Sequence, residues 1–360
     1  MARPNPLLLG LILLAPTAWA DLVVEVEPKN RAVKDNIEAY IGPVEAQSPD
    51  ELRRLFEHAD KQATRAAQAL GYYHSSNYLA VSGSEQDPTL TIKVDLGTPV
   101  RINAIDIDIQ GEGRGTDAFT LTLPDGLAPG KRLNHDNYES IKSQISNRAL
   151  RYGYFSGQYL KHQLRVNPDA NQADIDIAYL TGERYKLGEV SYSETPFSKE
   201  LLDRFIPFKP GVPYDADLVG QFNQDLLSSG YFSGVQVIAP PDKATGGTIP
   251  VEVELTARDP NSLGFGGGFS TDVGVRTKAT WDQHWLNAQG HSRGASAELS
   301  APRQQISAFY QVPLDPPLTS NLRWGLNCAS ALIMVGNARL VCGCKMRCSP
   351  WVMTQVQVTC

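Results

Sequence analysis

The sequence predicts three β-α-α-β-β repeats followed by the start of an antiparallel transmembrane β-barrel. Three observations carry this prediction: an export signal, a threefold internal repeat, and a later region in which apolar and polar residues alternate. The 360 residues are 42% hydrophobic and carry a formal net charge of −6. This hydrophobic content supports packed cores. A chain without a basic excess is not expected to bind nucleic acid.

The first 20 residues predict a signal peptide. Arg3 supplies a positive start, Leu7 to Ala15 is an apolar run, and Ala18-Trp19-Ala20 is a small-x-small site. Cleavage is therefore expected between Ala20 and Asp21. The alternative is a membrane anchor, but a spanning helix needs about twice as many apolar residues. The mature chain is expected in the periplasm, secreted, or inserted as a β-barrel.

A short motif occurs three times in the next part of the chain. Leu70-Gly71-Tyr72-Tyr73 returns as Tyr152-Gly153-Tyr154-Phe155 and again as Ser229-Gly230-Tyr231-Phe232. The period is about 80 residues, the size of a small domain. Repetition at a fixed period predicts three copies of one structural unit.

Each copy contains the same order of predicted elements. An amphipathic helix precedes each repeated glycine, which we expect at the C′ position, where the chain turns through the left-handed region. The aromatic pair after each glycine opens a strand, predicted over 72–81, 154–166 and 231–238. A further strand follows, and a strand and a shorter helix begin each copy. The three domains are expected at 21–97, 98–182 and 183–259.

This repeated order resembles the polypeptide-transport-associated (POTRA) domain, from Leu22 to about Arg258. The resemblance implies protein-binding modules of outer-membrane assembly and transport proteins, without enzymatic activity. The sheet of such a domain has a free edge strand, which can accept an extended peptide by β-augmentation. We expect these edges at the strands that the aromatic residues open: Tyr72, Tyr154, Phe155, Tyr231 and Phe232.

The sequence pattern changes after Asp259-Pro260. Residues 263–269 alternate large apolar residues with glycine, and side chains of a strand point alternately to its two faces. Three later segments, within 276–285, 295–301 and 305–312, also oppose an apolar face to a polar one. This pattern is typical of a transmembrane β-barrel, predicted over 260–327, and also of a soluble β-meander. The preceding repeats favour the barrel.

The combined order is similar to the BamA/TamA superfamily of outer-membrane assembly proteins, and three repeats point to its TamA branch. The similarity implies an outer-membrane protein with periplasmic N-terminal domains that receives unfolded outer-membrane proteins such as autotransporters. It also implies contact with outer-membrane lipid, and a TamB-like, inner-membrane-anchored partner at residues 22–96. The alternative is a periplasmic or secreted protein-binding module with a terminal β-meander and no membrane insertion.

The first barrel strand matches the strand that, in the resembled superfamily, offers a seam to incoming strands. Six of the eight residues from Gly264 to Thr271 are glycine, serine or threonine, and glycine-rich strands specify their register weakly. The alternative is that the glycines relieve crowding inside a barrel. The residues expected to pair with an incoming strand are Leu263, Gly264, Phe265, Gly266, Gly267, Gly268 and Phe269.

Residues 328–360 differ in composition from the rest of the chain. They hold all five cysteines and no Asp or Glu, and the period-two alternation is lost. We interpret this tail as out of frame or otherwise aberrant and expect no strands in it. The barrel is then incomplete, since the preceding residues hold only about four strands of ordinary length. A metal site at Cys342, Cys344 and Cys348 is disfavoured, because paired C-x-x-C arms and a nearby histidine are missing.

The sequence contains no constellation of catalytic residues. Gly264-Phe-Gly266 has Phe269 where a dinucleotide fingerprint needs its third glycine, and no H-E-x-x-H or G-x-S-x-G motif occurs. The carboxylate pairs Asp106/Asp108 and Asp174/Asp176 are expected on solvated strand faces rather than at a cation. We therefore predict no cofactor, no metal and no enzymatic activity.

Overall fold

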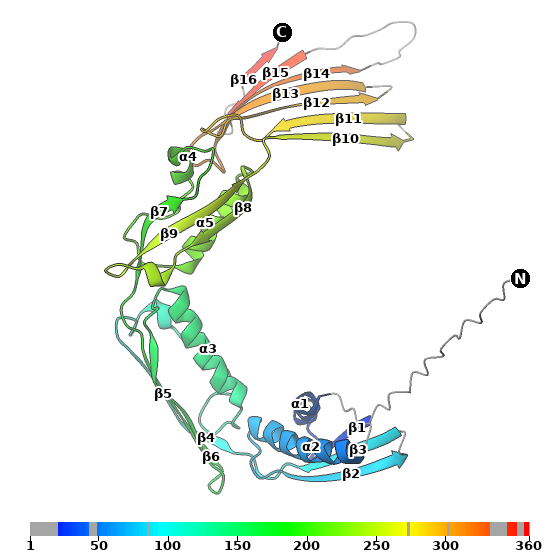
Figure 1. The fold of residues 1–360 in the computed structure, drawn as a ribbon, viewed down its shortest axis with the longest axis vertical. Helices are drawn as coiled ribbons and strands as arrows, with labels where there is room; N and C mark the ends of the chain where they lie inside the picture. The colour runs from blue at the N-terminus through cyan, green and yellow to red at the C-terminus, as the bar shows by residue number, and fades with distance from the viewer. Residues whose placement is uncertain are drawn as a thin grey trace, which may run out of the picture. The chain divides into compact units, whose positions relative to one another are not determined.

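The computed structural model describes residues 21–42, 49–84, 87–271, 274–300, 303–331, 344–350 and 356–359 (Figure 1). The predicted signal peptide and its last residue, Ala20, lie outside these residues. In the described part, no helix is long and apolar enough to cross a membrane. The chain forms two compact units: residues 1–148 with 157–180, and residues 149–156 with 181–360.

The first domain is a three-stranded sheet with two helices on one face. Its sheet has the order β1-β3-β2, in which β1 is parallel and β2 antiparallel to β3. Asn30 caps α1 by accepting a hydrogen bond from the N–H of Val33. Helix α2 presents alanines to the sheet, so the backbones approach closely, and Ala59 and Ala63 are fully buried with Ile92. The elements are β1 (Asp21–Glu27), α1 (Arg31–Ile41), α2 (Pro49–Ala69), β2 (Ser76–Ser84) and β3 (Asp87–Asp95).

The second domain repeats this topology with the sheet order β4-β6-β5. A 3-10 turn, η1, stands where the first domain has its first helix, and its Phe119 is buried and packs beside Tyr179. Ile141 and Ile145 of the long helix are fully buried. The elements are β4 (Arg101–Gln110), η1 (Asp117–Phe119), α3 (His135–Arg151), β5 (Gln158–Asn167) and β6 (Gln172–Leu180).

The third domain has the sheet order β7-β9-β8, again with a parallel and an antiparallel neighbour of the central strand. Ser198 caps α4 and Asp215 caps α5, as acceptor side chains do at helix starts. The elements are β7 (Lys186–Tyr192), α4 (Lys199–Asp203), α5 (Ala216–Ser228), β8 (Phe232–Ile238), η2 (Pro241–Lys243) and β9 (Thr248–Ala257).

A seven-stranded antiparallel sheet follows, with its strands in chain order from β10 to β16. The expectation that residues 328–360 contain no strand is wrong. β14 extends to Ala331, and β15 and β16 lie within the tail. Ladder hydrogen bonds join backbone groups, so pairing does not require alternating side chains. The strands are β10 (Asn261–Ser270), β11 (Gly274–Gln283), β12 (Ser292–Ser300), β13 (Arg303–Pro313), β14 (Asn321–Ala331), β15 (Cys344–Pro350) and β16 (Val356–Thr359).

The repeated glycines have the predicted backbone conformation, but two of the strands begin later than predicted. Gly71, Gly153 and Gly230 have φ values of 87°, 80° and 79°. The N–H of Tyr72 bonds to the carbonyl oxygen of Ala67 at 2.9 Å, and that of Tyr154 bonds to Ala149 at 2.8 Å. These are the bonds of a Schellman motif. The first aromatic residue therefore still belongs to the helix end, and β2 and β5 begin at Ser76 and Gln158.

Candidate strand-pairing surfaces

Each three-stranded sheet ends in an outer strand that follows the helices: β2, β5 and β8. Each pairs on one side with the central strand, so half of its backbone groups point away from the sheet. These strands carry exposed side chains of mixed kind, including Tyr78 in β2 at 70% and Leu160 in β5 at 52%. Among the described residues, the three strands expected to carry free edges are therefore outer strands, and peptide binding at them stays a prediction.

The aromatic residues expected to open these edges lie mostly in the cores instead. Tyr72, Tyr154 and Tyr231 are at most 8% exposed, and Phe232 is fully buried although it begins β8. Phe155 is half-buried and packs on the ring of Tyr214 at 4.9 Å. Their physical role is to fill the core at the end of each helix. The backbone N–H and C=O groups that form each edge lie further along the strand.

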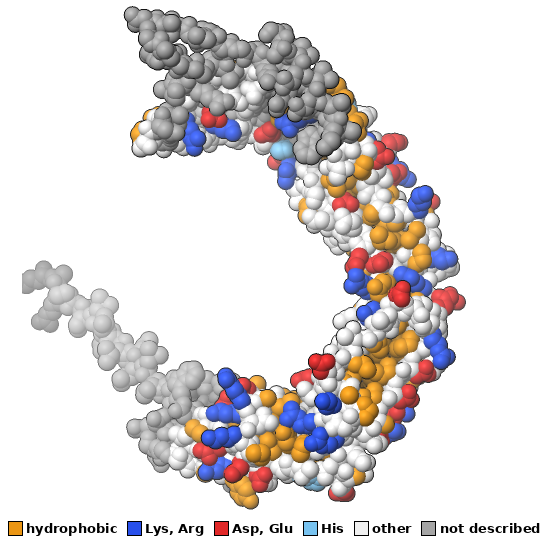
Figure 2. Space-filling model, turned by 180° about the vertical axis from the view of Figure 1, so that it is seen from behind, with side chains coloured by type: hydrophobic (Ala, Val, Ile, Leu, Met, Phe, Trp, Pro, Cys, Tyr) orange, Lys and Arg blue, Asp and Glu red, His pale blue; other side chains and the backbone are white. Residues whose placement is uncertain are grey.

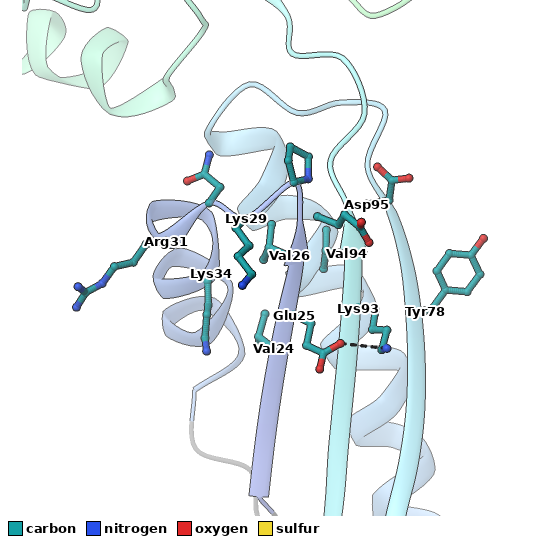
Figure 3. A pocket seen from close by; sticks show the side chains of 13 residues that line it. Val24, Glu25, Val26, Lys29, Arg31, Lys34, Tyr78, Lys93, Val94 and Asp95 are labelled. Carbon is teal, nitrogen blue, oxygen red and sulfur yellow. Dashed lines mark ion pairs between the residues drawn. The ribbon is translucent and has the colours of Figure 1, made fainter.

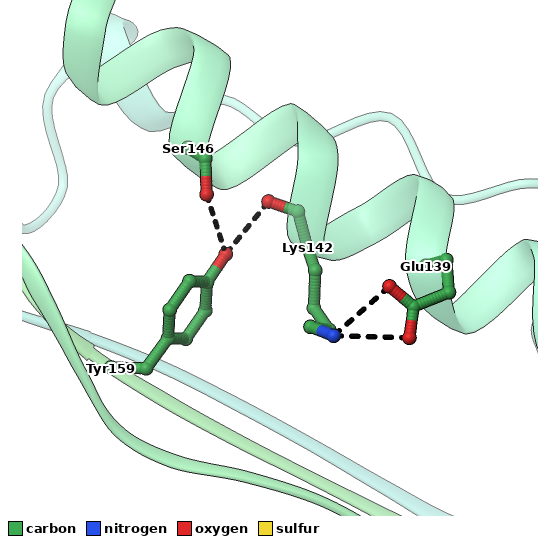
Figure 4. Close-up of polar contacts among 4 residues, drawn as sticks. All are labelled: Glu139, Lys142, Ser146 and Tyr159. Atoms are coloured by element: carbon green, nitrogen blue, oxygen red, sulfur yellow. Dashed lines mark hydrogen bonds and ion pairs between the residues drawn. The ribbon is translucent and has the colours of Figure 1, made fainter.

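Strand β5 is fixed to helix α3 through one tyrosine (Figure 4). The Tyr159 hydroxyl donates a hydrogen bond to the Lys142 carbonyl oxygen at 2.7 Å and lies 3.2 Å from the Ser146 hydroxyl. The Lys142 ammonium pairs with Glu139 at 2.9 Å. Burial raises the pKa of Tyr159 above its ordinary value. These contacts hold the start of the outer strand while leaving its far edge open.

Further along β5, two cations meet one carboxylate. Asp176 of β6 pairs with Lys161 at 3.0 Å and with Arg165 at 2.5 Å. Asp174 accepts a hydrogen bond from Asn103. Among the residues that the structure describes, no cluster of three potential metal ligands occurs. The two carboxylates therefore form ion pairs and a hydrogen bond within the sheet. The positive charges of β5 disfavour edge-to-edge aggregation.

The remaining surface of the first domain contains a groove of about 810 Å³ beside β1 (Figure 3). It is lined by residues of β1, of the start of α1 and of β3, with Tyr78 from β2. Both acidic and basic side chains contribute. Sequence reasoning did not find this groove, because no motif marks it. Its position depends on how α1 passes the edge of the sheet.

Strand β10 is an outer strand of the large sheet and pairs only with β11 among the described strands. A Cβ on Gly266 would meet nothing within 4 Å, whereas one on Gly264 would lie 2.6 Å from Thr280 Oγ1. Crowding therefore accounts for Gly264 but not for Gly266. Hollows of about 320 and 410 Å³ lie at the glycines, lined in part by Lys278 and by Phe265. Among the described strands, the predicted seam residues therefore lie in an outer strand, and their pairing with an incoming strand stays a prediction.

One face of this sheet is apolar across several strands. Phe265 pairs with Ala279, Ala279 with Ala297, and Ala297 with Ile306. Phe265 is 83% exposed and Ile306 is 60% exposed. A face of exposed apolar side chains on alternate residues is what a membrane-facing sheet requires. Other exposed residues on this face are Leu263, Phe269, Val275, Leu299, Trp324 and Leu326.

The alternation within 276–285 predicts that Trp285 shares this face with Thr277, Ala279 and Trp281, but Trp285 does not lie on it. Strand β11 ends at Gln283, and the Trp285 ring packs on Phe197 of the third domain at 5.4 Å. Its indole N–H donates a hydrogen bond to the Arg258 carbonyl oxygen at 2.8 Å. The connection between β11 and β12 is therefore part of the junction with the third domain.

Charged side chains of both signs lie among hydrophobic ones over the three domains (Figure 2).

Comparisons with known proteins agree with these features. Residues 23–96 match the family model described as POTRA domain TamA domain 1, and residues 185–258 match the POTRA model described as surface antigen variable number repeat. Together with the fold, these matches define a protein with POTRA domains followed by an antiparallel sheet.

One solved structure shares this architecture at low sequence identity, and a second is similar over part of it. The chain is similar to BamA from Haemophilus ducreyi lacking POTRA domains 1–3, with a TM-score of 0.57 and 16% identity over 69% of this chain and 47% of that chain. CdiB from Acinetobacter baumannii gives a TM-score of 0.39 and 14% identity over 69% and 49%. The first of these likenesses supports the fold. The chain spans about half the length of that BamA structure.

Proposed function

We propose that this protein acts in the assembly or secretion of outer-membrane proteins. Its substrates are unfolded, β-rich outer-membrane proteins such as autotransporters. The observation that carries this proposal is the combination of open edges: β2, β5 and β8 on the POTRA domains, and β10 on a sheet with an exposed apolar face. The proposed location is the outer membrane, with the POTRA domains in the periplasm.

Backbone pairing explains how such edges receive many different chains. An unfolded membrane strand has N–H and C=O groups that need partners, and an open edge supplies them without reading the sequence. The hydrogen bonds also keep the strand extended, which is its conformation in the final barrel. No covalent step and no cofactor is needed. The POTRA edges hold the chain transiently, and β10 pairs with it at the membrane.

The proposal includes the TamA branch of the superfamily and its partner. Residues 23–96 match the first POTRA model of TamA, which supports a TamB-like, inner-membrane-anchored protein as the partner of this first domain. Outer-membrane lipid is the proposed environment of the apolar face. Contact with lipid requires the face to remain uncovered by protein, and its large side chains are exposed.

The experiment that tests this function measures location and substrate preference together. Membranes from cells that express the chain are washed with urea, and the retained chain is offered a radiolabelled autotransporter barrel. We expect urea-resistant outer-membrane association and binding of the urea-unfolded barrel but not of the folded barrel. A soluble periplasmic product that binds both forms equally would instead support a protein-binding module without membrane insertion.

A further inference from the structure

The second domain, residues 98–182, is described without a gap, and the outer edge of its strand β4 is covered only at its start. The N–H of Ile102 bonds to the Lys131 carbonyl oxygen at 2.8 Å, and the N–H of Gly130 bonds to the Ile102 carbonyl oxygen at 2.7 Å. The one basic side chain of β4, Arg101, also donates a hydrogen bond to the Gly130 carbonyl oxygen at 2.8 Å. The segment before α3 therefore covers the first residues of β4.

The rest of this edge has no backbone partner among the described residues. Side chains and backbone groups both alternate along a strand, so residues that share a face point their N–H and C=O groups to the same side. A bulge between Ile102 and Ala104 shifts the alternation by one residue, and Ile105, Ile107 and Ile109 are then paired with buried residues of β6. These isoleucines share the helix side of the sheet with Ile102. Their backbone groups therefore point away from β6, where no described residue bonds to them.

The same three isoleucines form an apolar strip on the helix side of β4. All three are only partly buried. The first domain has the eleven-residue helix α1 beside its first strand, whereas the second domain has only the three-residue turn η1. A further strand beside β4 would remove from water the apolar surface that remains exposed.

The opposite face of β4 carries two carboxylates, Asp106 and Asp108, and neither has an ion pair with a described residue. Asp106 is exposed, and Asp108 accepts one hydrogen bond, at 2.6 Å, from an amide side chain of the same strand. The cations of this face, Lys161 and Arg165, lie on β5 at the other edge of the sheet, where both pair with Asp176. The uncovered part of the β4 edge is therefore apolar on one face and acidic on the other.

We propose that the uncovered edge of β4, residues 104–110, binds an extended substrate segment in which apolar and basic residues alternate. The segment adds a fourth strand to the second sheet, with its backbone bonded to the three isoleucines. Its apolar side chains cover the isoleucine strip, and its basic side chains face Asp106 and Asp108. Alternation of apolar and polar residues is also the pattern of a transmembrane strand. The inference rests on the proposed function and deepens it, because it names a class of substrate segment and a further edge that binds it.

The test uses the full chain in micelles of a non-ionic detergent and two fluorescent decapeptides. One alternates valine with lysine, and the other alternates valine with glutamate. Fluorescence anisotropy, corrected for binding to empty micelles, measures the affinity of each peptide. Hydrogen exchange of residues 104–110 and 158–167 measures which edge of the sheet is covered. The variant is Asp106→Lys, and the matched control is Asp169→Lys, at an exposed aspartate of the same domain without an ion pair to any described residue.

We expect the lysine peptide to bind at least about tenfold more tightly than the glutamate peptide and to slow exchange in 104–110. Asp106→Lys is expected to weaken binding of the lysine peptide about fivefold, whereas Asp169→Lys leaves it unchanged. Equal binding of the two peptides, slowed exchange in 158–167 alone, or equal affinities of the two variants would each overturn the proposal. Loss of substrate preference in the membrane assay, with the lysine peptide still covering 104–110, would count against the proposed function alone.

Discussion

The hydroxyl of Tyr231 donates a hydrogen bond to the backbone carbonyl oxygen of Gly290 at 2.8 Å, in a buried environment. Tyr231 belongs to the third POTRA domain, and Gly290 lies in the connection between β11 and β12. A Cβ on Gly290 would lie 2.8 Å from this hydroxyl and 2.8 Å from Leu201 Cδ2. The third domain and the first strands of the sheet are therefore joined by a close-packed contact as well as by the chain.

Removing this hydroxyl is expected to destabilise the junction. Tyr231→Phe leaves the Gly290 carbonyl oxygen buried without its donor, which costs about 1–3 kcal/mol. Urea unfolding followed by tryptophan fluorescence measures the change, because Trp285 lies in the same contact. Tyr214→Phe is the control, since no hydrogen bond of that hydroxyl to a described residue is present. Equal unfolding midpoints for Tyr231→Phe and the unaltered chain would show that the contact contributes nothing.

The same residue predicts a loss of stability in alkali. Burial raises the pKa of Tyr231 to about 12, whereas an unfolded tyrosine has an ordinary value near 10. The folded chain therefore holds this proton more tightly. The contribution of the protonated Tyr231 hydroxyl to the free energy of unfolding is fully present below a pH of about 10. It is lost as the pH rises to about 12. Unfolding midpoints across this range should fall less steeply for Tyr231→Phe than for the unaltered chain. If the midpoints of Tyr231→Phe and of the unaltered chain fell equally steeply with pH, Tyr231 would not be the source of this pH dependence.

A pair of glycine substitutions separates backbone strain from a local clash. Gly153 and Gly230 both have positive φ, but a Cβ on Gly153 would lie 2.6 Å from Tyr214 Cβ, and one on Gly230 would meet nothing within 4 Å. Gly230→Ala should cost about 1–2 kcal/mol from the left-handed conformation alone. Gly153→Ala should cost measurably more. Urea unfolding of the full chain provides both values, and equal costs would mean that Tyr214 moves aside freely.

Substitutions in β10 distinguish the two interpretations of its glycines. Gly266→Val meets open space, so we expect the free energy of unfolding to stay within about 0.5 kcal/mol. If the flexible edge pairs with substrate strands, the same change should weaken capture of the unfolded autotransporter barrel. Gly264→Val is the contrasting variant, because its Cβ would contact Thr280. Unaltered capture by Gly266→Val would contradict a role of the glycine-rich edge in pairing with substrate strands.

The element order and the repeat were predictable because each relies on local signals. The C′ glycines and the amphipathic helices specify their own conformation, and all three glycines have positive φ. The strand starts were not predictable, since Tyr72 and Tyr154 complete hydrogen bonds to the preceding helix. The alternation of apolar residues in β11 predicts that Trp285 lies on the apolar face. The Trp285 ring instead packs on Phe197, which is distant in the sequence.

Site-specific photo-crosslinking tests the central claim most directly. Gln236 of the outer strand β8 is paired in register with Glu254 of the central strand β9, and both are exposed. Phe265 of β10 is likewise paired with Ala279 of β11. Each position receives a photo-reactive side chain, and the full chain is irradiated with a urea-unfolded autotransporter barrel. The account predicts strong crosslinks from Gln236 and Phe265 and weak ones from Glu254 and Ala279. Equal crosslinking at both members of each pair would contradict binding through the open edges.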